Sequence, residues 1–510
     1  MSSTDTGVTY VDALYAHADL TPDAPALVTT DEVVSYRDLA NRIERLAGRL
    51  IGDGIRPEQV CAIAVPRVLD AVIAMAAVTR AGAAFLTLDT ELPLVRLAAM
   101  VDSAGARHLL TETGLAQRLA LPVPGRTVLL DRPADTPTHP VLPPRIHPRS
   151  LAYVSHTSGS TGTPNAVLIE HRGLENYLRR IRWDHGLGPH TASVQVAPLG
   201  YDASIRDIFA PLTAGGRLIL VPRAALLRPD GFAAAVRALD GNTVLSATPS
   251  LLTVLAADGA QGLPPLRLVL ASGESLRPFL LSGRRRVITG DLVNQYGPTE
   301  CTMTSTRFRV PPVSQTDGDL VGTPIDQVTV QLLDARLRPV PDGAIGEVHI
   351  GGVGVARGYG GRPGLTADRF VPDPSGPPGA RMYRTGDLAR RHPDGNLEYL
   401  GRADRQIKIR GYRLDPAEIE GALLRYPAVT NAVVVAETDD RGRTYLVAHI
   451  AGEPATVTDP ALRAHLARTL PYYMMPRRFV RVAIMPTTAS GKADRATLRA
   501  AAPLAGDPSV

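Results

Sequence analysis

Two lysines are the first candidates for charge chemistry in this chain. Of 55 basic residues only Lys408 and Lys492 are lysine, and every other one is arginine. An ammonium group is a compact charge on a thin stem that can enter a tight pocket, whereas a guanidinium group is a planar fork. We therefore expect the two lysines to stand where arginine cannot act. Their surroundings, QIKIRGYR and ASGKADR, favour function over chance.

Small and hydroxyl-bearing residues are concentrated in the segment SHTSGSTGTPNAV, residues 155–167. Glycine allows the backbone to approach an anion closely, and amide and hydroxyl groups then donate hydrogen bonds to phosphate oxygens. The segment is not a Walker loop, because no Gly-Lys-Ser or Gly-Lys-Thr follows. By itself such a segment predicts either a phosphate-binding loop or an ordinary loop.

Five further motifs follow this loop in order. They are NQYGPTE at 294–300, YRTGD at 383–387, GRADRQIKIRGYRLDPAEIE at 401–420, LPYYMMP at 470–476 and SGKADR at 490–495. Together they resemble the adenylate-forming (AMP-binding) superfamily, and they are most similar to stand-alone amino-acid adenylation domains of nonribosomal peptide synthetases. The resemblance covers nearly the whole chain, from about residue 33 to residue 495.

The resemblance implies an enzyme that joins an amino acid to AMP, releases pyrophosphate, and passes the aminoacyl group to a phosphopantetheine thiol. It implies ATP and Mg²⁺ as cofactors. The nucleotide-binding residues that it implies are Thr157, Ser158, Gly159, Ser160, Thr161, Gly162, Gly273, Glu274, Asn294, Tyr296, Asp387, Tyr399 and Arg402. Tyr296 would stack on adenine, and Asp387 would accept hydrogen bonds from both ribose hydroxyls.

Three residues are implied to be catalytic. The transition state of adenylation is crowded with negative charge, so the protein contributes positioning and electrostatic stabilisation. Lys492 would bridge the substrate carboxylate and the α-phosphate, which Thr299 would also bind, and Glu300 would hold Mg²⁺. Lys408 would serve the transfer step. This chain has Asn165 where the family usually has lysine, so the neighbouring Thr163 and the backbone must suffice there, or Lys492 contributes more.

The segment YDASIRDIF, residues 201–209, resembles the motif whose aspartate binds the substrate ammonium group, and Asp202 occupies that position. A buried carboxylate needs a cation as partner, which favours an amino acid over an acyl or aryl acid. The implied substrate pocket consists of Asp202, Ala203, Arg206, Ser246, Leu270, Ser272, Gln295, Met303 and Thr304, closed by Lys492.

Arg206 is the unusual residue of this pocket, because the position is commonly apolar or aromatic in the family. A guanidinium group prefers a bidentate carboxylate partner. One interpretation is therefore a dicarboxylic or β-type amino acid with a second carboxylate at Arg206. The other is that Arg206 pairs with Asp207, which leaves a pocket for a small polar or neutral amino acid.

Composition excludes several function classes. The net charge is +5, but the arginines are interspersed with acids and aromatic residues make up only 5% of the chain, so we expect no nucleic-acid partner. The most apolar stretch, residues 60–88, is interrupted by charges and predicts no membrane span. Cys61 and Cys301 fit neither a disulfide framework nor a zinc ribbon, and the N-terminus has no signal-peptide pattern, so we expect a cytoplasmic protein.

Helical and strand-like patterns alternate along most of the chain and predict an α/β (mixed α+β) fold with a largely parallel sheet. Residues 33–50 predict an amphipathic helix, and residues 60–66 predict a buried strand. From Thr329 onward, hairpin patterns predict antiparallel strands. With the resemblance, we expect a large N-terminal domain at 1–402, its core motifs at 151–402, and a small mobile C-terminal α+β domain at 403–510 with a hinge near Asp404.

The motifs end at residue 495 with no carrier-domain pattern after them, so we expect a stand-alone ligase that acts with a separate acyl or peptidyl carrier protein. A small MbtH-like helper protein is a further candidate partner. Three alternatives stay open: an acyl- or aryl-CoA ligase, a D-alanine–carrier protein ligase, and a non-catalytic nucleotide-binding module. The last predicts loss of Lys492, Glu300 or Asp387, and all three are present.

Overall fold

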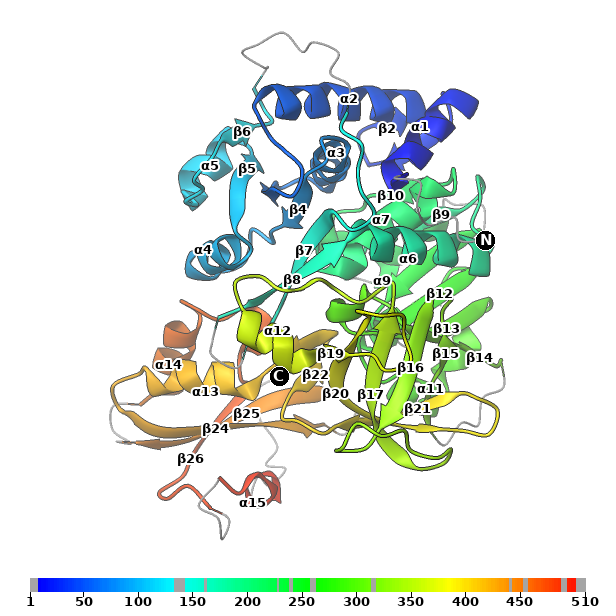
Figure 1. Cartoon of the computed structure of the whole chain (residues 1–510). Coiled ribbons are helices and arrows are strands. Elements are labelled where there is room, and N and C mark those ends of the chain that lie inside the picture. The colour runs from blue at the N-terminus through cyan, green and yellow to red at the C-terminus, as the bar shows by residue number, and fades with distance from the viewer. Residues whose placement is uncertain are drawn as a thin grey trace. The chain divides into compact units, whose positions relative to one another are not determined.

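The computed structural model describes residues 8–132, 143–159, 163–226, 229–237, 242–256, 263–312, 318–439, 443–452, 457–487 and 493–500. The chain divides into two compact units (Figure 1). The first comprises Met1–Thr90, Met100–His156 and Asn165–Asp404. The second comprises Glu91–Ala99, Thr157–Pro164 and Arg405–Val510.

The first unit contains two sheets. Within the described residues, the smaller has seven strands in the order β18 (Gly358–Tyr359), β8 (Asn165–Glu170), β7 (Leu151–Thr157), β4 (Ala84–Thr87), β3 (Val60–Ala64), β5 (Ala106–Thr111) and β6 (Thr127–Leu129). Strand β3 pairs in parallel with β4 and β5, and all its residues are buried. A strand covered on both faces is apolar throughout, which is why residues 60–66 predict it correctly.

The larger sheet has fourteen strands in the described part of the chain. Its order is β16 (Val328–Leu333), β17 (Ile345–Gly352), β20 (Arg381–Arg391), β21 (Leu397–Arg402), β15 (Asp319–Pro324), β14 (Thr306–Val310), β13 (Asp291–Tyr296), β12 (Leu268–Ser272), β11 (Thr243–Ala247), β9 (Ala192–Val194), β10 (Arg217–Ile219), β1 (Pro25–Val28) and β2 (Val33–Ser35), with β19 (Phe370–Pro372) beside β20.

Pairing in this sheet changes from parallel to antiparallel at β13 and also at β1, which is parallel to β10 and antiparallel to β2. Strand β13 pairs in parallel with β12 and antiparallel with β14. The antiparallel part therefore begins at Thr306, earlier than the predicted change at Thr329, although the β16–β17 hairpin is antiparallel as expected. The mixed sheets and their helices confirm the predicted α/β fold class.

The helices of the first unit surround these sheets. They are α1 (Tyr10–Leu20), α2 (Tyr36–Gly52), α3 (Val68–Arg80), α5 (Thr113–Leu119), α6 (His171–Asp184), α7 (Asp202–Thr213), α8 (Arg223–Leu226), α9 (Pro229–Arg237), α10 (Pro249–Leu255), α11 (Arg277–Leu281) and α12 (Pro363–Arg369), with the 3₁₀ turns η1 (Arg284–Val287) and η2 (Thr299–Cys301). Helix α4 (Leu94–Ser103) spans both units.

Helix α2 begins later than the sequence pattern predicts. The Ser35 hydroxyl accepts a 3.1 Å hydrogen bond from the backbone N–H of Asp38 and so caps the helix. The preceding residues, Val33–Ser35, form strand β2 instead and pair with β1. Because Ser35 is the N-cap, the helix begins at the next residue. The predicted 33–50 helix was therefore wrong at its first turn.

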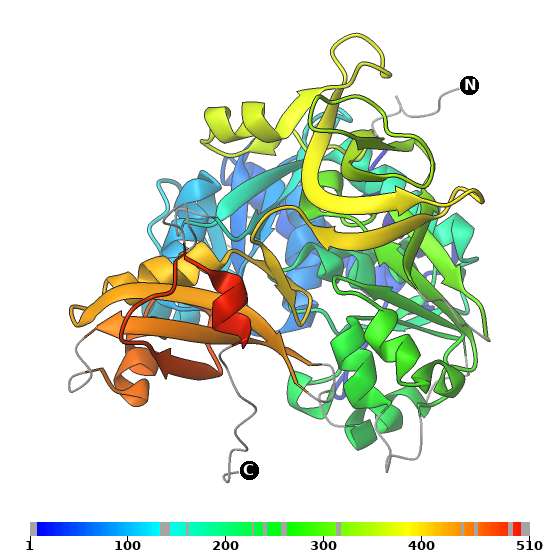
Figure 2. The same ribbon diagram turned by 90° about the horizontal axis from the view of Figure 1, so that it is seen from below.

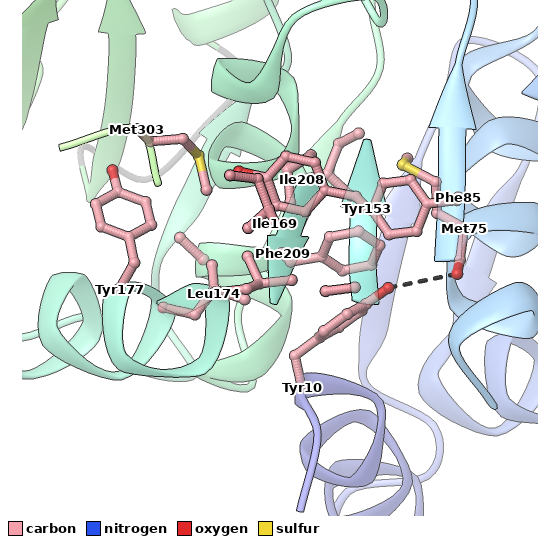
Figure 3. Packing of buried hydrophobic residues seen from close by; sticks show 14 of the residues in the cluster. Tyr10, Met75, Phe85, Tyr153, Ile169, Leu174, Tyr177, Ile208, Phe209 and Met303 are labelled. Carbon is pink, nitrogen blue, oxygen red and sulfur yellow. Dashed lines mark hydrogen bonds between the residues drawn. The ribbon is translucent and has the colours of Figure 1, made fainter. Parts of the chain in front are cut away.

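A large apolar core lies between the helices and sheets of the first unit (Figure 3). Tyr10 packs against Phe209 with a centroid distance of 4.3 Å, and the Tyr10 hydroxyl lies 2.8 Å from the Thr79 hydroxyl. Both cysteines are buried in the first unit as free thiols. No described helix is long and apolar enough to cross a membrane.

The second unit is built around one long hairpin, drawn in orange in Figure 2. Strands β24 (Val429–Thr438) and β25 (Thr444–Gly452) are antiparallel, and β26 (Arg478–Arg481) joins β25 in parallel. A separate hairpin is formed by β22 (Ile407–Ile409) and β23 (Tyr412–Leu414). The helices here are α13 (Pro416–Leu424), α14 (Asp459–Leu466) and α15 (Arg495–Ala500), with the 3₁₀ turn η3 (Tyr472–Met474).

Candidate functional site

Several strands of the large sheet bring predicted nucleotide-binding residues together. Asp387 on β20 lies directly opposite Arg402 on β21, and Nη1 of Arg402 donates a 2.6 Å hydrogen bond to Oδ1 of Asp387. Tyr296, at the end of β13, donates from its hydroxyl to Oδ2 of Asp387 at 2.6 Å. The Tyr399 hydroxyl lies 3.5 Å from Oδ1 of Asp387. The buried carboxylate is thus oriented by two phenols and one guanidinium group.

These phenols remain neutral donors. Burial raises the pKa of Tyr296 well above its usual value, and the charge of Asp387 raises it further. Burial likewise raises the pKa of Tyr399. Because a neutral phenol donates and a carboxylate accepts, the arrangement fixes Asp387 as an acceptor. A carboxylate held in this way can accept hydrogen bonds from two neighbouring hydroxyl groups.

Arg402 also forms hydrogen bonds with Asp404, the last residue of the first unit. Its Nε and Nη2 atoms donate to the two Asp404 carboxylate oxygens at 2.6 and 2.7 Å. Nη2 additionally donates to the Thr385 carbonyl oxygen at 2.9 Å. One guanidinium group therefore connects Asp387 to the end of this unit.

The residues predicted at the adenine edge lie near the carboxyl ends of β12 and β13. The amide nitrogen of Asn294 is directed to the Leu320 carbonyl oxygen at 2.8 Å. The Glu274 carboxylate accepts hydrogen bonds from the backbone N–H and the hydroxyl of Ser250. Gly273 has φ +91°, a left-handed conformation that suits glycine. The Glu274 side chain is therefore engaged by Ser250, while Gly273 has no side chain.

Glu300 lies in η2, directly after the β13 strand, and is 1% exposed. Its Oε1 atom accepts a 2.8 Å hydrogen bond from the Tyr359 hydroxyl, which lies 3.1 Å from the Tyr383 hydroxyl. Within the described residues, no group of three or more His, Cys, Asp or Glu side chains could hold a metal. A single oriented carboxylate fits Mg²⁺, which is commonly bound by one or two carboxylates together with substrate phosphates and water.

Asp202 is the first residue of helix α7. Its Oδ2 atom is buried and accepts no hydrogen bond from any described residue. Burial raises the pKa of Asp202, while a hydrogen bond from the Thr299 hydroxyl and the charge of Arg206 act in the opposite direction. The carboxylate therefore lies next to the Thr299–Glu300 pair and has capacity for one more donor.

Arg206, one turn further along α7, is 4% exposed and held by three neighbours. Nη1 donates to the Ser272 hydroxyl at 3.3 Å and to Oε1 of Gln295 at 3.2 Å. Nε lies 3.4 Å from Oδ1 of Asp207. Arg206 thus contacts Asp207, as one of the two interpretations expects, and it also contacts two polar residues of the implied pocket.

The remaining pocket residues surround Arg206. Thr304 lies 3.5 Å from Oε1 of Gln295 through its hydroxyl oxygen. Ser246 and Leu270 line a small cavity beside Arg206, and Ala203 follows Asp202 in α7. Met303 is buried at one end of the apolar cluster (Figure 3). Tyr177 of α6, whose hydroxyl is near Arg206 and Thr304, also lies here, although no sequence motif surrounds it.

The phosphate loop is described only in part. Thr157, Ser158 and Gly159 follow the apolar part of β7, and the Ser158 hydroxyl donates a 2.9 Å hydrogen bond to the Arg413 carbonyl oxygen within the second unit. Ser160, Thr161, Gly162 and the catalytic candidate Lys492 lie outside the described residues. Lys408 lies on β22 directly opposite Arg413.

Comparison with family models identifies two matching regions. The model described as "AMP-binding enzyme" matches residues 14–360, and the model described as "AMP-binding enzyme C-terminal domain" matches residues 418–492. Both regions contain predicted motifs.

Curated relatives are long synthetases. A dimodular nonribosomal peptide synthase from Bacillus subtilis is 37% identical over 506 residues, which cover 95% of this chain and 21% of the relative. Phosphinothricin tripeptide synthetase PhsB from Streptomyces viridochromogenes is 42% identical over 507 residues, which cover 95% of this chain and 41% of the relative. The chain therefore spans less than half the length of these two relatives.

Solved structures share the fold. NpsA-ThdA, an artificially fused adenylation-PCP di-domain from Klebsiella oxytoca, aligns over 93% of both chains with a TM-score of 0.81 and 26% identity. An o-succinylbenzoate CoA synthetase (MenE) from Bacillus subtilis aligns over 96% of this chain and 98% of its own, with a TM-score of 0.84 and 21% identity. The second likeness, at that identity, concerns the fold alone.

Proposed function

The chain belongs to the AMP-binding enzyme family, and from this premise we propose that it activates an amino acid with ATP. In the first half-reaction, a carboxylate oxygen of the amino acid attacks the α-phosphorus, the bond to the bridging oxygen of the β-phosphate breaks, and pyrophosphate leaves. In the second, the phosphopantetheine thiol of a carrier protein loses its proton and attacks the aminoacyl carbonyl carbon, and AMP leaves.

Asp202 is the observation that carries this proposal. Its buried Oδ2 atom accepts no hydrogen bond within the described part of the chain, and burial raises its pKa. A buried carboxylate oxygen without a donor is costly, and a substrate ammonium group would supply that donor. An acyl or aryl acid would leave Oδ2 of Asp202 without a donor, which argues against an acyl- or aryl-CoA ligase with the same nucleotide-binding residues.

The residues around Asp387 support ATP as the nucleotide. We infer that Asp387 accepts the ribose hydroxyls while Arg402 and Tyr399 orient it, and that the ring of Tyr296 stacks on adenine. The backbone of Gly273 and Glu274, together with Asn294, would border the adenine edge. The loop residues Thr157, Ser158, Gly159, Ser160, Thr161 and Gly162 would donate to the leaving phosphates.

Charge at the reacting phosphorus requires a metal ion and a mobile cation. Mg²⁺, when bound, neutralises phosphate charge and orients the phosphate chain. The Glu300 carboxylate would hold this ion, because the Tyr359 hydroxyl already fixes its orientation. Thr299 would donate to the α-phosphate, and the Lys492 ammonium would bind the α-phosphate and the substrate carboxylate together.

The transfer step is assigned to the other lysine. We propose that Lys408 acts in transfer, that Asp404 is a hinge, and that a large domain at 1–402 is followed by a mobile small domain at 403–510. The Klebsiella oxytoca didomain, which joins adenylation and PCP domains, supports a carrier protein as partner. A small MbtH-like helper protein is a candidate partner that assays with and without it would test.

Arg206 determines which amino acid fits. Its neutral contacts with Ser272 and Gln295 could be exchanged for a second substrate carboxylate, which supports a dicarboxylic or β-type amino acid. Its contact with Asp207 supports the alternative of a small polar or neutral amino acid, including D-alanine. Met303 and Thr304 would complete the pocket in either case.

ATP–pyrophosphate exchange over a panel of α-amino, β-amino, dicarboxylic and D-amino acids tests the proposal. We expect exchange with one of these classes and none with fatty or aryl acids. A transfer assay that offers a carrier protein and free coenzyme A should show transfer to the carrier. Absence of exchange with every acid would leave the non-catalytic nucleotide-binding module, and preference for coenzyme A would identify a CoA ligase.

A further inference from the structure

A strained turn follows the metal-binding candidate Glu300. The consecutive residues Thr302 and Met303 have φ +58° and +70°, which is the left-handed region. Neither is glycine, and a β-branched residue such as threonine is an outlier there, because its side chain crowds the backbone. Such strain persists only where surrounding contacts hold it, and it is concentrated at functional sites.

Hydrogen bonds hold the turn on both sides of Thr302. The Thr302 hydroxyl donates a 2.7 Å bond to the carbonyl oxygen of Gly354, which follows β17. The Thr302 backbone N–H donates to the Thr299 carbonyl oxygen at 3.1 Å. The Thr304 N–H donates back to the Thr302 carbonyl oxygen at 2.8 Å. Thr302 is 2% exposed, and its hydroxyl hydrogen is used within the protein.

Helix α6 supports the same turn by close packing. A Cβ atom added at Gly173 would lie 2.6 Å from the Thr302 hydroxyl oxygen and 3.3 Å from the Val353 carbonyl oxygen. Glycine is therefore needed there for the helix to approach the turn. Tyr177, four residues later on α6, lies beside Met303 (Figure 3). Helix α6 thus carries a glycine packed against Thr302 and a tyrosine drawn near Met303.

Along the chain, Thr302 separates two parts of the proposed active site. Glu300 and Thr299 precede it, while Met303 and Thr304 follow it and border the pocket around Arg206. We propose that Thr302 is a positioning residue, whose anchored left-handed backbone sets the amino-acid pocket at a fixed distance and angle from the metal-binding carboxylate. This inference rests on the proposed adenylation function and adds to it a residue that touches neither substrate.

Substitution of the hydroxyl tests the inference. Thr302→Val keeps the shape and removes the donor to Gly354, and Thr302→Ser keeps the donor. With Thr302→Val we expect the KM for the preferred amino acid to rise about tenfold, the scale of one lost buried hydrogen bond, with smaller discrimination against near analogues. The KM for ATP should change less than twofold. Thr302→Ser should restore most of the wild-type KM and selectivity.

Crowding from α6 is an independent test. Gly173→Ala should displace the Thr302 hydroxyl and reproduce the same selective rise in the amino-acid KM. Gly114→Ala, in helix α5, is the matched control, because a Cβ there meets nothing within 4 Å. The control should keep wild-type kinetics, and melting temperatures of all variants should be measured alongside.

Two results distinguish failure of this inference from failure of the proposed function. If the wild-type protein exchanges pyrophosphate with no amino acid, the proposed function fails. If the wild type is active but Thr302→Val and Gly173→Ala lower only the folded fraction, with both KM values and the selectivity unchanged, Thr302 is merely structural and the inference is overturned. A parallel rise of both KM values would also contradict it.

Discussion

The Tyr296 hydroxyl donates a 2.6 Å hydrogen bond to the Asp387 carboxylate, although 91 residues separate them. This contact connects a residue proposed to stack on adenine with one proposed to bind ribose. Because Tyr296 is held by this bond, the plane of its ring and the direction of the carboxylate are set together. Two halves of one nucleotide would thus be recognised by a coupled pair rather than by independent side chains.

Removal of this hydroxyl should weaken nucleotide binding. Tyr296→Phe keeps the ring and frees one oxygen of Asp387 from its donor. We expect the KM for ATP to rise about ten- to a hundredfold, the scale of one hydrogen bond to a charged group, with a smaller effect on the amino-acid KM. Pyrophosphate exchange as a function of ATP concentration measures it. Tyr15→Phe makes the same change at an exposed bond to Glu44 and should leave both constants unchanged.

Substrate binding should depend on pH through Asp202. Burial raises the pKa of this carboxyl group, and only the charged form pairs with a substrate ammonium group. The amino-acid KM should therefore rise as the pH falls through this raised pKa, while the KM for ATP should not follow the same curve. A pH profile in which both constants change together would contradict the assignment.

Loss of the Asp202 charge should lower activity without lowering stability. A raised carboxyl pKa favours the protonated form in the folded protein, so ionisation lowers stability as the pH rises. Asp202→Asn should therefore keep or raise the melting temperature at neutral pH, an effect that should vanish in acid, where the wild-type carboxyl group is protonated. The same variant should lose at least about a hundredfold in exchange, measured as kcat/KM for the amino acid, because the ammonium partner is gone.

Substitution of each lysine should lower the activity measured in a different assay. Lys492→Ala should lower adenylate formation by about 10²–10³, the scale for one electrostatic donor to a transition state. Lys408→Ala should spare exchange and slow transfer to the carrier protein. Exchange and single-turnover transfer measure the two steps separately. Near-normal exchange in Lys492→Ala, or equal loss of both activities in Lys408→Ala, would contradict these roles.

Arg206 should determine substrate choice. Replacing it alone would leave the buried Asp207 carboxylate uncompensated and destabilise the protein by about 3–5 kcal/mol. The double variant Arg206→Met with Asp207→Asn removes both charges and avoids that cost. If the substrate carries a second carboxylate, the double variant should lose it selectively and accept neutral analogues. An unchanged preference across the amino-acid panel would exclude the dicarboxylic class.

Residues of one short motif are bound to lie near one another, because seven consecutive residues cannot separate far. Tyr296, Thr299 and Glu300 lie within NQYGPTE, so their proximity follows from chain connectivity. Buried strand β3 was predictable for a similar reason, since a strand covered on both faces needs an unbroken apolar run. The start of helix α2 was missed because a short cap at Ser35 competes with the longer amphipathic pattern.

Contacts between distant segments depended on the tertiary structure alone. The sequence identified Asp387 and Arg206 as candidates. It could not show that the Tyr296 hydroxyl of β13 donates to Asp387. Nor could it show that Arg206 contacts Ser272, Gln295 and Asp207 together. The sequence did not indicate Thr302 for the same reason. Its proposed role depends on close packing by a glycine of α6 and on a hydrogen bond to a carbonyl group after β17. Residue type specifies what chemistry is available, whereas hydrogen-bond partners and close packing arise only when strands and helices meet.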